Sequence, residues 1–332
     1  MISYSISRTN NHSNKEITSI LANVPLSRTC NLEVELISFG AGIRRISYID
    51  RDKDINKLLT LSYADIFESC QNSSLAGLTI GPNAGRLPAW QDIVLKDETS
   101  SVTVNLPANE DDTKQIHGGS HNLSSIDWNY MGVSASHNDE EISFIFSCSQ
   151  EEGVDGWPGN RKYEVVYTLS SSGTINIFLK GETDKKTYIN MTNHTYWLRN
   201  SLTLEVMANS FIVNHDDFLP KAISNLDSDM FSVTDNAVLN NAFILNSDCA
   251  ARISYSDIPL AIDLCTDAPA LVVYTGDYLD SGTLLYGGKH SSPSCAIALE
   301  AQELYPFTPI SIISENKSFK RNIQLRFINT ET

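Results

Sequence analysis

The stretch Leu32-Glu33-Val34-Glu35-Leu36 alternates strictly between apolar and acidic side chains. Because successive side chains of a β-strand point to opposite faces, this pattern predicts a strand with one buried face and one exposed face. The same period of two is the dominant pattern of the chain, whereas convincing helical periodicity is nearly absent. We predict five further strands within residues 142–146, 163–167, 174–179, 202–206 and 323–327.

Clusters of small and polar residues separate the predicted strands. Ser170-Ser171-Ser172-Gly173 is typical of a hairpin loop, and residues 155–160 predict a longer turn. The sequence has no linker, low-complexity tract or internal repeat that would divide it. Many short strands at close spacing predict an all-β protein, a large antiparallel β-sandwich in which residues 1–332 form a single domain.

Four segments lack the strand pattern. Residues 53–68 and 222–230 could each hold a short helix, although neither segment is long or well capped. The non-periodic stretches around 83–120 and 209–240 are predicted loops. Because loops on a rigid sheet commonly carry binding and catalytic residues, these stretches are candidates for the functional site.

Composition and charge limit the classes of function. The 332 residues are 41% apolar, which is enough for a sizeable core, and no stretch approaches the roughly 18 apolar residues of a membrane helix. The formal net charge of −16 disfavours nucleic acid and anionic membranes, because both attract basic surfaces. We therefore expect neither kind of partner. The oligomeric state is left open by the composition.

The N-terminal residues and the cysteines bear on where the protein works. Residues 1–15 are polar and lack the apolar segment of a secretory signal, so we expect no export. The six cysteines are scattered and form no CxxC pair, which favours reduced thiols. Together these features predict a cytoplasmic protein.

Three residues form a candidate set for acid–base chemistry. His194 follows a predicted strand end among small polar residues, and its imidazole can both give and take a proton near neutral pH. His117 precedes Gly118-Gly119, and Glu300 follows the apolar run 296–299. A buried carboxylate is costly unless it is paired or functional. Each residue also has a structural interpretation: a histidine satisfied at a strand end, a turn residue and a partnered glutamate.

Neither a metal site nor a dinucleotide site is supported by the motifs. His117 and His121 have the spacing of a helical zinc motif, but Gly118-Gly119 disfavours a helix and no glutamate follows the first histidine. Gly40-Ala41-Gly42 lacks the third glycine and the helix of a dinucleotide-binding loop. We therefore predict no metal and no nucleotide cofactor.

Nucleophilic catalysis and glycoside hydrolysis are the other enzymatic alternatives. The sequence has no GxSxG motif and no cysteine in an evident basic setting, so a nucleophilic serine or cysteine lacks support. Glu300 could form the carboxylate pair of a glycosidase with Asp277 or Asp217. Spacing in the sequence cannot decide this, so the alternative stays open.

In content and in order, several motifs resemble those of the aldose 1-epimerases, also called galactose mutarotases. The combination of Thr-Asn-His-x-Tyr, His-Gly-Gly and Glu-x-Gln is specific, and the resemblance runs from about residue 30 to the C-terminus. The segments that carry it are Phe39-Gly40-Ala41, 81–87, 116–119, 155–159, 192–197, Phe218-Leu219-Pro220, 273–276 and 299–302.

The resemblance implies a fold, a reaction and a set of site residues. The implied fold is the large antiparallel super-sandwich of galactose mutarotases. The implied reaction interconverts the α and β anomers of a free aldose and requires neither metal nor cofactor. Glu300 would be the general base and His194 the general acid. The residues that would contact the monosaccharide are Arg86, His117, Asn240 and Gln302.

In the implied reaction Glu300 takes the proton of the anomeric hydroxyl while His194 delivers a proton to the ring oxygen. The ring opens, C1 turns about the C1–C2 bond, and closure reverses both transfers. Groups whose pKa values lie near the working pH suit such a reversible exchange.

The chain departs from the family pattern in the implied sugar clamp. Pro82 stands where the family has an arginine, and Asn240-Asn241 replaces an aspartate-histidine pair. An amide can still bond a hydroxyl, but it is not an equivalent acceptor. Because the catalytic pair is retained, we expect activity on an aldose. Galactose or glucose as the substrate stays open.

Two alternatives share the implied fold. A hexose-phosphate mutarotase would need a basic cluster in its pocket, and the acidic chain offers few cations near the motifs, among them Arg86 and Arg161-Lys162. A non-catalytic sugar-binding protein would have no need of the proton-transfer pair His194 and Glu300. We therefore expect an isomerase, an aldose 1-epimerase.

Overall fold

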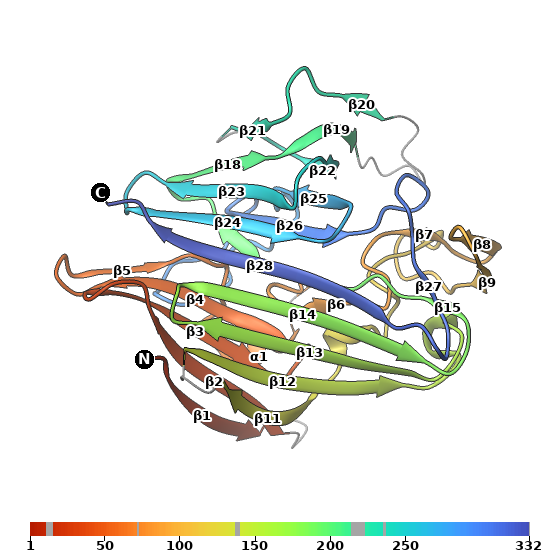
Figure 1. Ribbon diagram of the computed structural model, residues 1–332, viewed down its shortest axis with the longest axis horizontal. Coiled ribbons are helices and arrows are strands. Elements are labelled where there is room, and N and C mark those ends of the chain that lie inside the picture. The colour runs from red at the N-terminus through yellow and green to blue at the C-terminus, as the bar shows by residue number, and fades with distance from the viewer. Residues whose placement is uncertain (11–15, 72, 137–139, 214–222, 235–236, 332) are drawn as a thin grey trace.

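The computed structural model of the protein describes residues 1–10, 16–71, 73–136, 140–213, 223–234 and 237–331. Strands dominate the molecule, as Figure 1 shows, with 55% of the structure in strands and 4% in helices. The strands of its three large sheets pair antiparallel throughout the described residues. The predicted all-β class with antiparallel sheets is therefore confirmed.

The largest sheet is the long curved layer that crosses the middle of Figure 1. Its hairpin from β13 to β14 turns at residues 170–174, as the serine-rich cluster predicts. In the described part of the chain its nine strands run in the order β11 (Asn129–Ala135), β12 (Glu141–Gln150), β13 (Arg161–Ser170), β14 (Thr174–Thr183), β28 (Phe319–Asn329), β24 (Leu260–Thr266), β23 (Cys249–Tyr255), β18 (Leu202–Val206) and β21 (Phe231–Val233).

Two further sheets face this layer. Over the described residues, one contains β1 (Ser3–Asn10), β2 (Glu16–Pro25), β3 (Cys30–Ile37), β4 (Gly42–Asp50) and β5 (Ile55–Leu58), in chain order. The other, within the same limits, has the order β17 (Tyr196–Leu198), β26 (Ala296–Gln302), β25 (Ala270–Tyr274), β22 (Asn240–Leu245), β19 (Ala208–Val213) and β20 (Ser224–Asn225).

Short elements connect the large sheets. Four pairs of strands are described: β6 (Thr79–Ile80) with β16 (Thr192–Asn193), β7 (Leu87–Pro88) with β10 (Lys114–Gln115), β8 (Asp92–Lys96) with β9 (Ser101–Asn105), and β15 (Thr187–Tyr188) with β27 (Ile312–Ile313). The helical segments are α1 (Ile66–Gln71) and the 3-10 turns η1 (Leu123–Ser125) and η2 (Val154–Gly156). Among the described helices, none has the length and apolar character needed to cross a membrane.

The main hydrophobic core lies between the nine-stranded sheet and the other two sheets. It takes Phe144 and Val165 from the nine-stranded sheet, Val34 and Ile46 from β3 and β4, and Leu299 from β26. These side chains are almost wholly shielded from solvent, and the removal of their apolar surface from water stabilises the layered arrangement. The apolar side chains of the alternating pattern, first seen at residues 32–36, thus lie on the strand faces that form this core.

Some sequence expectations for single segments are wrong. The segment 53–68 is mainly strand β5 and loop, and helix α1 begins only at Ile66. The described residues 223–230 hold the short strand β20 instead of a helix. The stretches 83–120 and 209–240, expected to be loops, contain short strands as well. The secondary structure of these segments is determined by pairing with a neighbouring strand. That strand is distant in the sequence, so a local pattern does not indicate it.

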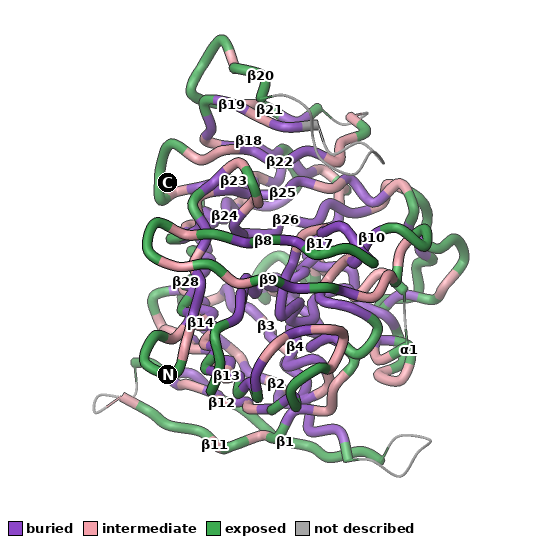
Figure 2. Tube along the Cα trace, turned by 90° about the vertical axis from the view of Figure 1, so that its right-hand side faces the viewer, coloured by how far each residue is buried: buried purple, intermediate pink, exposed green. Residues whose placement is uncertain are grey.

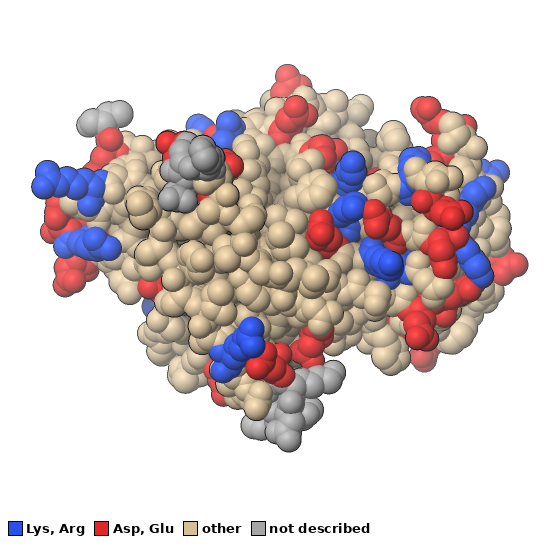
Figure 3. All heavy atoms as spheres, turned by 60° about the horizontal axis from the view of Figure 1, so that its bottom comes forward, with Lys and Arg blue, Asp and Glu red and all other residues tan. Residues whose placement is uncertain are grey.

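The surface views show where the chain meets solvent. Strand β1 is exposed along its whole length at one edge of the molecule, whereas the inner strands are buried (Figure 2). On the face drawn in Figure 3, lysine and arginine side chains are interspersed with aspartate and glutamate. No basic patch of the kind that binds phosphate backbones stands out on this face.

Candidate active site

Glu300 lies on the side of β26 that faces away from the main core. Ile297, Leu299 and Ala301 point into that core, so the period of two turns Ala298 and Glu300 to the opposite face. Glu300 is only 4% exposed although it carries a charge. The alternation along this apolar strand therefore places the Glu300 carboxylate in a position shielded from solvent. A buried carboxylate requires polar partners.

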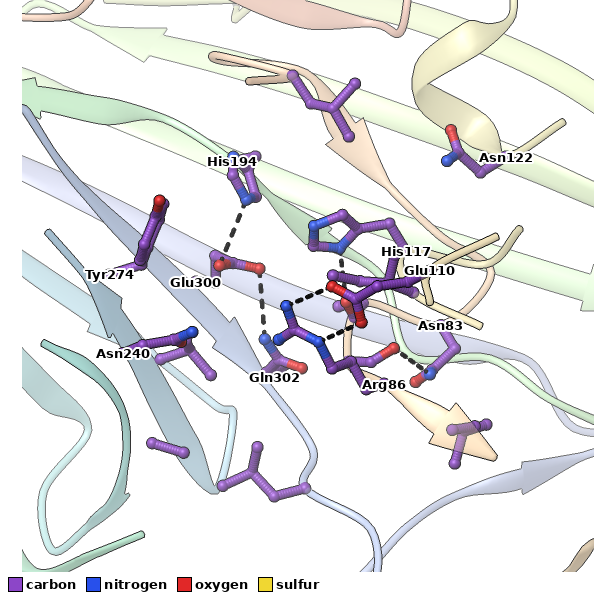
Figure 4. Close-up of a pocket in the computed structure, with 18 of the residues that line it drawn as sticks. Asn83, Arg86, Glu110, His117, Asn122, His194, Asn240, Tyr274, Glu300 and Gln302 are labelled. Carbon is purple, nitrogen blue, oxygen red and sulfur yellow. Dashed lines mark hydrogen bonds and ion pairs between the residues drawn. The ribbon is translucent and has the colours of Figure 1, made fainter. Parts of the chain in front are cut away.

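Within the described part of the chain, the side chains of His194 and Gln302 contact the carboxylate of Glu300. His194 Nε2 lies 3.4 Å from Oε1, and Gln302 Nε2 lies 3.4 Å from Oε2 (Figure 4). Burial raises the pKa of Glu300, but the attraction and hydrogen bond of His194, with smaller effects of His117 and Arg86, outweigh it and hold the pKa below its usual range. Glu300 is therefore a carboxylate at neutral pH and able to accept a proton.

His194 is fixed by its backbone and by aromatic neighbours. Its N–H donates to the Leu78 carbonyl at 2.9 Å, and its own carbonyl accepts from the Gly77 N–H at 2.9 Å. The ring contacts Tyr196 and His117 edge-on, with centroids 5.0 Å and 5.2 Å away. Its Nδ1 atom is buried and has no hydrogen-bond partner among the described residues. The two neighbouring rings hold the imidazole so that Nε2 points at Glu300.

His117 occupies a turn that only its two glycines allow. Its backbone φ is +55°, and Gly118 and Gly119 follow at +89° and +113°. A Cβ on Gly118 would lie 2.5 Å from the Gly81 carbonyl oxygen, and one on Gly119 would lie 2.3 Å from the Asp155 side chain. The His-Gly-Gly motif is thus a steric requirement of a close backbone approach.

The tautomer of His117 follows from one contact. Nδ1 lies 2.7 Å from the Ala84 carbonyl oxygen, which can only accept, so Nδ1 carries the proton and donates it. Burial and the neighbouring His194 lower the pKa of His117 to about 4. His117 is therefore neutral at pH 7, and its Nε2 is an acceptor for a hydroxyl hydrogen.

Arg86 reaches the cavity wall together with an acidic partner. Its Nε and Nη2 donate to the two oxygens of Glu110 at 2.6 Å and 2.8 Å, a side-on bidentate pair. Burial raises the pKa of Glu110, but the hydrogen bonds and charge of Arg86 outweigh it and lower that pKa. Arg86 is thus present at the cavity wall, as expected, and it forms an ion pair with Glu110 there.

One cavity of about 680 Å³ brings the sequence-predicted residues together, although they lie far apart along the chain (Figure 4). A space of this size accommodates a small organic ligand. The predicted site residues that line it are Arg86, His117, His194, Asn240, Glu300 and Gln302.

The residues of the open alternatives lie elsewhere or outside the described residues. His121 is 81% exposed on its side chain and contacts Asp155 at 3.4 Å, so it does not join His117 at a shared centre. Asp277 is not among the residues that line the cavity, and Asp217 falls outside the described residues. The cavity carboxylate beside Arg86 is instead Glu110, which no sequence motif indicates.

Tyr196 and Tyr274 are two of the tyrosines that line the cavity, and neither was predicted individually. Tyr196 follows His194 on β17, and Tyr274 ends β25 opposite Asn240 of β22. The Tyr274 hydroxyl accepts the Tyr278 N–H at 2.8 Å, and burial raises the pKa of Tyr274 to about 12. Its hydroxyl therefore keeps its proton and can donate it to a ligand. Both tyrosines lie within motif segments, which is the signal that could have found them.

The sequence is similar to known proteins along most of its length. A sequence model of the aldose 1-epimerase family matches residues 23–310. The chain is 24% identical to the aldose 1-epimerase of Escherichia coli K12 over 314 residues, which cover 86% of each chain. It is 29% identical to the aldose 1-epimerase of Haemophilus influenzae over 72% of this chain and 74% of the relative. To the galactose mutarotase of Sus scrofa it is 24% identical over 76% and 77%.

Solved structures show the same fold. The galactose 1-epimerase of Lactobacillus acidophilus superimposes with a TM-score of 0.81 at 21% identity, and the match covers all of both chains. An aldose epimerase homologue from Caenorhabditis elegans gives 0.75 at 21% identity, over 94% of this chain and all of the other. The predicted galactose mutarotase-like super-sandwich is therefore confirmed.

Proposed function

Since this chain belongs to the aldose 1-epimerase family, we propose that Glu300 and His194 carry out its acid–base chemistry. The protein is an isomerase that interconverts the α and β anomers of a free aldose. The observation that supports the two residues is their contact: His194 Nε2 and Glu300 Oε1 lie 3.4 Å apart in the shared cavity. The anomeric oxygen and the ring oxygen of an aldose are bonded to one carbon, so a base and an acid must lie side by side to reach both.

In the forward half of the reaction the carboxylate of Glu300 accepts the proton of the C1 hydroxyl. Nε2–H of His194 donates a proton to the ring oxygen as the bond between C1 and that oxygen breaks. The product is the open-chain aldehyde, with the former ring oxygen now a hydroxyl. After rotation about C1–C2, the ring closes on the other face of C1. Glu300 gives its proton to the carbonyl oxygen and His194 takes the proton of the attacking hydroxyl, so both residues return to their starting protonation states. The side-by-side placement lets the pair exchange roles without external acid or base.

We propose that Arg86, His117, Asn240 and Gln302 bind the sugar hydroxyls. Neutral His117 offers an acceptor at Nε2, and the buried Gln302 Oε1 has no hydrogen-bond partner within the described residues. Arg86 and the Asn240 amide supply donors. A mixture of donors and acceptors around a small cavity suits the hydroxyls of a monosaccharide, each of which both donates and accepts.

The charge of the cavity favours a neutral aldose over a sugar phosphate. Among the described residues that line it, Arg86 is the single lysine or arginine, and it is paired with Glu110. Of the other carboxylates of the lining, Glu303 faces Arg321 at 3.5 Å and Asp111 faces Lys114 at 3.8 Å, whereas Glu300 faces the cavity beside His194. A phosphate group would need cations or helix N-termini here and would instead meet repulsion.

We further propose that residues 1–332 work as a single domain in the cytoplasm. The core that contains Val34, Phe144 and Leu299 is shared by the three large sheets, which supports one folding unit. The six cysteines are free thiols in the structure, in keeping with a reducing compartment.

The test is an anomer-exchange panel measured by NMR or polarimetry on freshly dissolved galactose, glucose, xylose, arabinose and fucose. Acceleration over buffer for at least one aldose is expected, and Glu300→Gln serves as the matched control. A hexose 6-phosphate should not be preferred over its parent hexose. Activity on no sugar would favour a non-catalytic binding protein, and release of reducing ends from a glycoside would favour the glycosidase.

A further inference from the structure

The ion pair of Arg86 and Glu110 is built into the wall of the cavity. Glu110 lies in the loop between β9 and β10, where its carbonyl accepts the N–H groups of Thr113 and Lys114 at 3.3 Å and 3.0 Å. The preceding Asn109 side chain bonds both the N–H and the carbonyl of Ile116, at 2.8 Å and 3.0 Å. The loop that carries Glu110 is thus anchored to the residue just before His117.

The position of the pair matters because a second carboxylate is near. Figure 4 shows the Arg86 guanidinium between Glu110 on one side and the Glu300–Gln302 end of β26 on the other. Arg86 is close enough to Glu300 to lower the pKa of that carboxyl. A guanidinium that is not held elsewhere would be drawn to a buried carboxylate, and such a pairing lowers a carboxyl pKa by about 1 to 3 units.

We propose that Glu110 is a positioning residue of the epimerase: it holds the Arg86 guanidinium on the cavity wall, offsets its charge, and so keeps Glu300 available to accept the anomeric proton. This inference rests on the proposed role of Glu300. Glu110 does not touch the reacting atoms in this scheme. It acts through Arg86, by giving that cation a carboxylate partner other than the base.

The groups around each carboxylate support these separate roles, in which Glu110 holds Arg86 and Glu300 acts as the base. The described titratable and charged groups that face Glu300 are His194, Tyr196, His117 and Arg86, and burial keeps Tyr196 uncharged. With His117 neutral at pH 7, Arg86 is the one permanent cation in this set. Glu110 has Arg86 as its hydrogen-bonded partner, with weaker attraction from Lys114.

A purely stabilising role fits the exposure of the pair less well. The side chains of Arg86 and Glu110 are 30% and 24% exposed. Solvent partly screens an ion pair at this depth, which reduces its contribution to folding, although the bidentate geometry retains part of that contribution. The consequence of losing Glu110 should therefore appear in catalysis before it appears in thermal stability.

The experiment compares the pH profile of kcat/KM for wild type and Glu110→Gln on the aldose that the wild type turns over best. In Glu110→Gln, Arg86 shifts toward Glu300, and the acid limb should move to lower pH by about one unit or more. The weaker base should lower the plateau kcat about three- to tenfold. Glu110→Asp should restore part of the wild-type behaviour. Asp112→Asn, an exposed change in the same loop that does not line the cavity, should leave the profile unchanged.

The Arg86→Gln background makes the test decisive. There the cation is gone, so adding Glu110→Gln should no longer move the acid limb. An unshifted acid limb in the single variant, or an equal shift in the Arg86→Gln background, overturns the inference. A wild type that accelerates no anomer exchange removes the proposed function itself, whereas an active wild type with an inactive Glu300→Gln and an unshifted Glu110→Gln removes this inference alone.

Discussion

Replacing Glu300 by glutamine removes the proposed base with little change in shape. Oε1 of Glu300 faces His194 Nε2 and Oε2 accepts from Gln302 Nε2, both at 3.4 Å. A glutamine oxygen can still accept from His194, and the Gln302 amide can turn its own oxygen toward the new NH₂ group. The variant should therefore keep the cavity and bind sugar nearly as well as the wild type.

The rate should fall far more than binding does. A neutral amide cannot accept the anomeric proton, and the loss of general-base catalysis typically costs about 10² to 10⁴ in rate. This loss corresponds to about 3 to 5 kcal/mol in the activation barrier. Because the proton moves only in the transition state, kcat and kcat/KM should fall together while KM changes little.

The pH dependence of the Tm difference between wild type and Glu300→Gln is a second test, and its direction follows from the pKa of Glu300. The pKa of Glu300 is lowered in the folded protein, so its ionised form contributes stability above the unfolded value of about 4.3. That contribution is lost as the pH falls through the folded pKa. The Tm difference between wild type and Glu300→Gln should thus be largest near neutral pH and should shrink below about pH 4.

The assay is NMR exchange between the anomers of the best aldose, with Tm measured by circular dichroism from pH 3 to pH 8. Lys320→Gln, at an exposed position of strand β28, is a control that changes charge outside the cavity. Near-normal turnover in Glu300→Gln would refute the assignment and return Glu300 to the status of a structural carboxylate. A loss of activity accompanied by loss of the folded signal at pH 7 would equally contradict the prediction of an intact cavity.

Three further outcomes are expected. Combining His194→Asn with Glu300→Gln should cost far less in kcat than the product of the two single losses, because the residues act as one relay, and multiplicative losses would contradict this. Gly119→Ala should lower Tm and activity, because the new Cβ would lie 2.3 Å from the Asp155 side chain and the backbone φ is +113°. The expected strain is about 1–3 kcal/mol, so an unchanged Tm would contradict this prediction. Asn240→Asp should lower KM for hexoses about fivefold, because a charged acceptor bonds a hydroxyl more strongly, whereas an unchanged KM across the sugar panel would argue against sugar contact at this position.

Several features of the molecule could be predicted from local pattern. The strands at 32–36, 142–146, 163–167, 174–179, 202–206 and 323–327 follow from alternation, because the period of a strand is a property of its own backbone. The hairpin at 170–173 follows from its turn residues. The order of the motifs indicated the family, and the comparisons confirm it.

Segments whose structure depends on a neighbour were predicted poorly. Residues 55–58 look compatible with a helix in isolation, yet they pair with β4 as strand β5. The strands within 83–120 are short and lie opposite partners that the local pattern does not reveal. Backbone pairing is a long-range interaction, and its hydrogen bonds override weak local propensity.

By itself the sequence determined the all-β class, the alternating faces and the chemical types of the candidate site, because these depend on neighbouring residues and on side-chain identity. Only the tertiary structure decided which groups meet. It set Glu300 against His194, fixed the His117 tautomer through the Ala84 carbonyl, and gave Arg86 the partner Glu110. Contacts between distant segments are decided by sheet pairing and loop packing, so the charge of the cavity, and with it the strength of the proposed base, emerges only when the chain is folded.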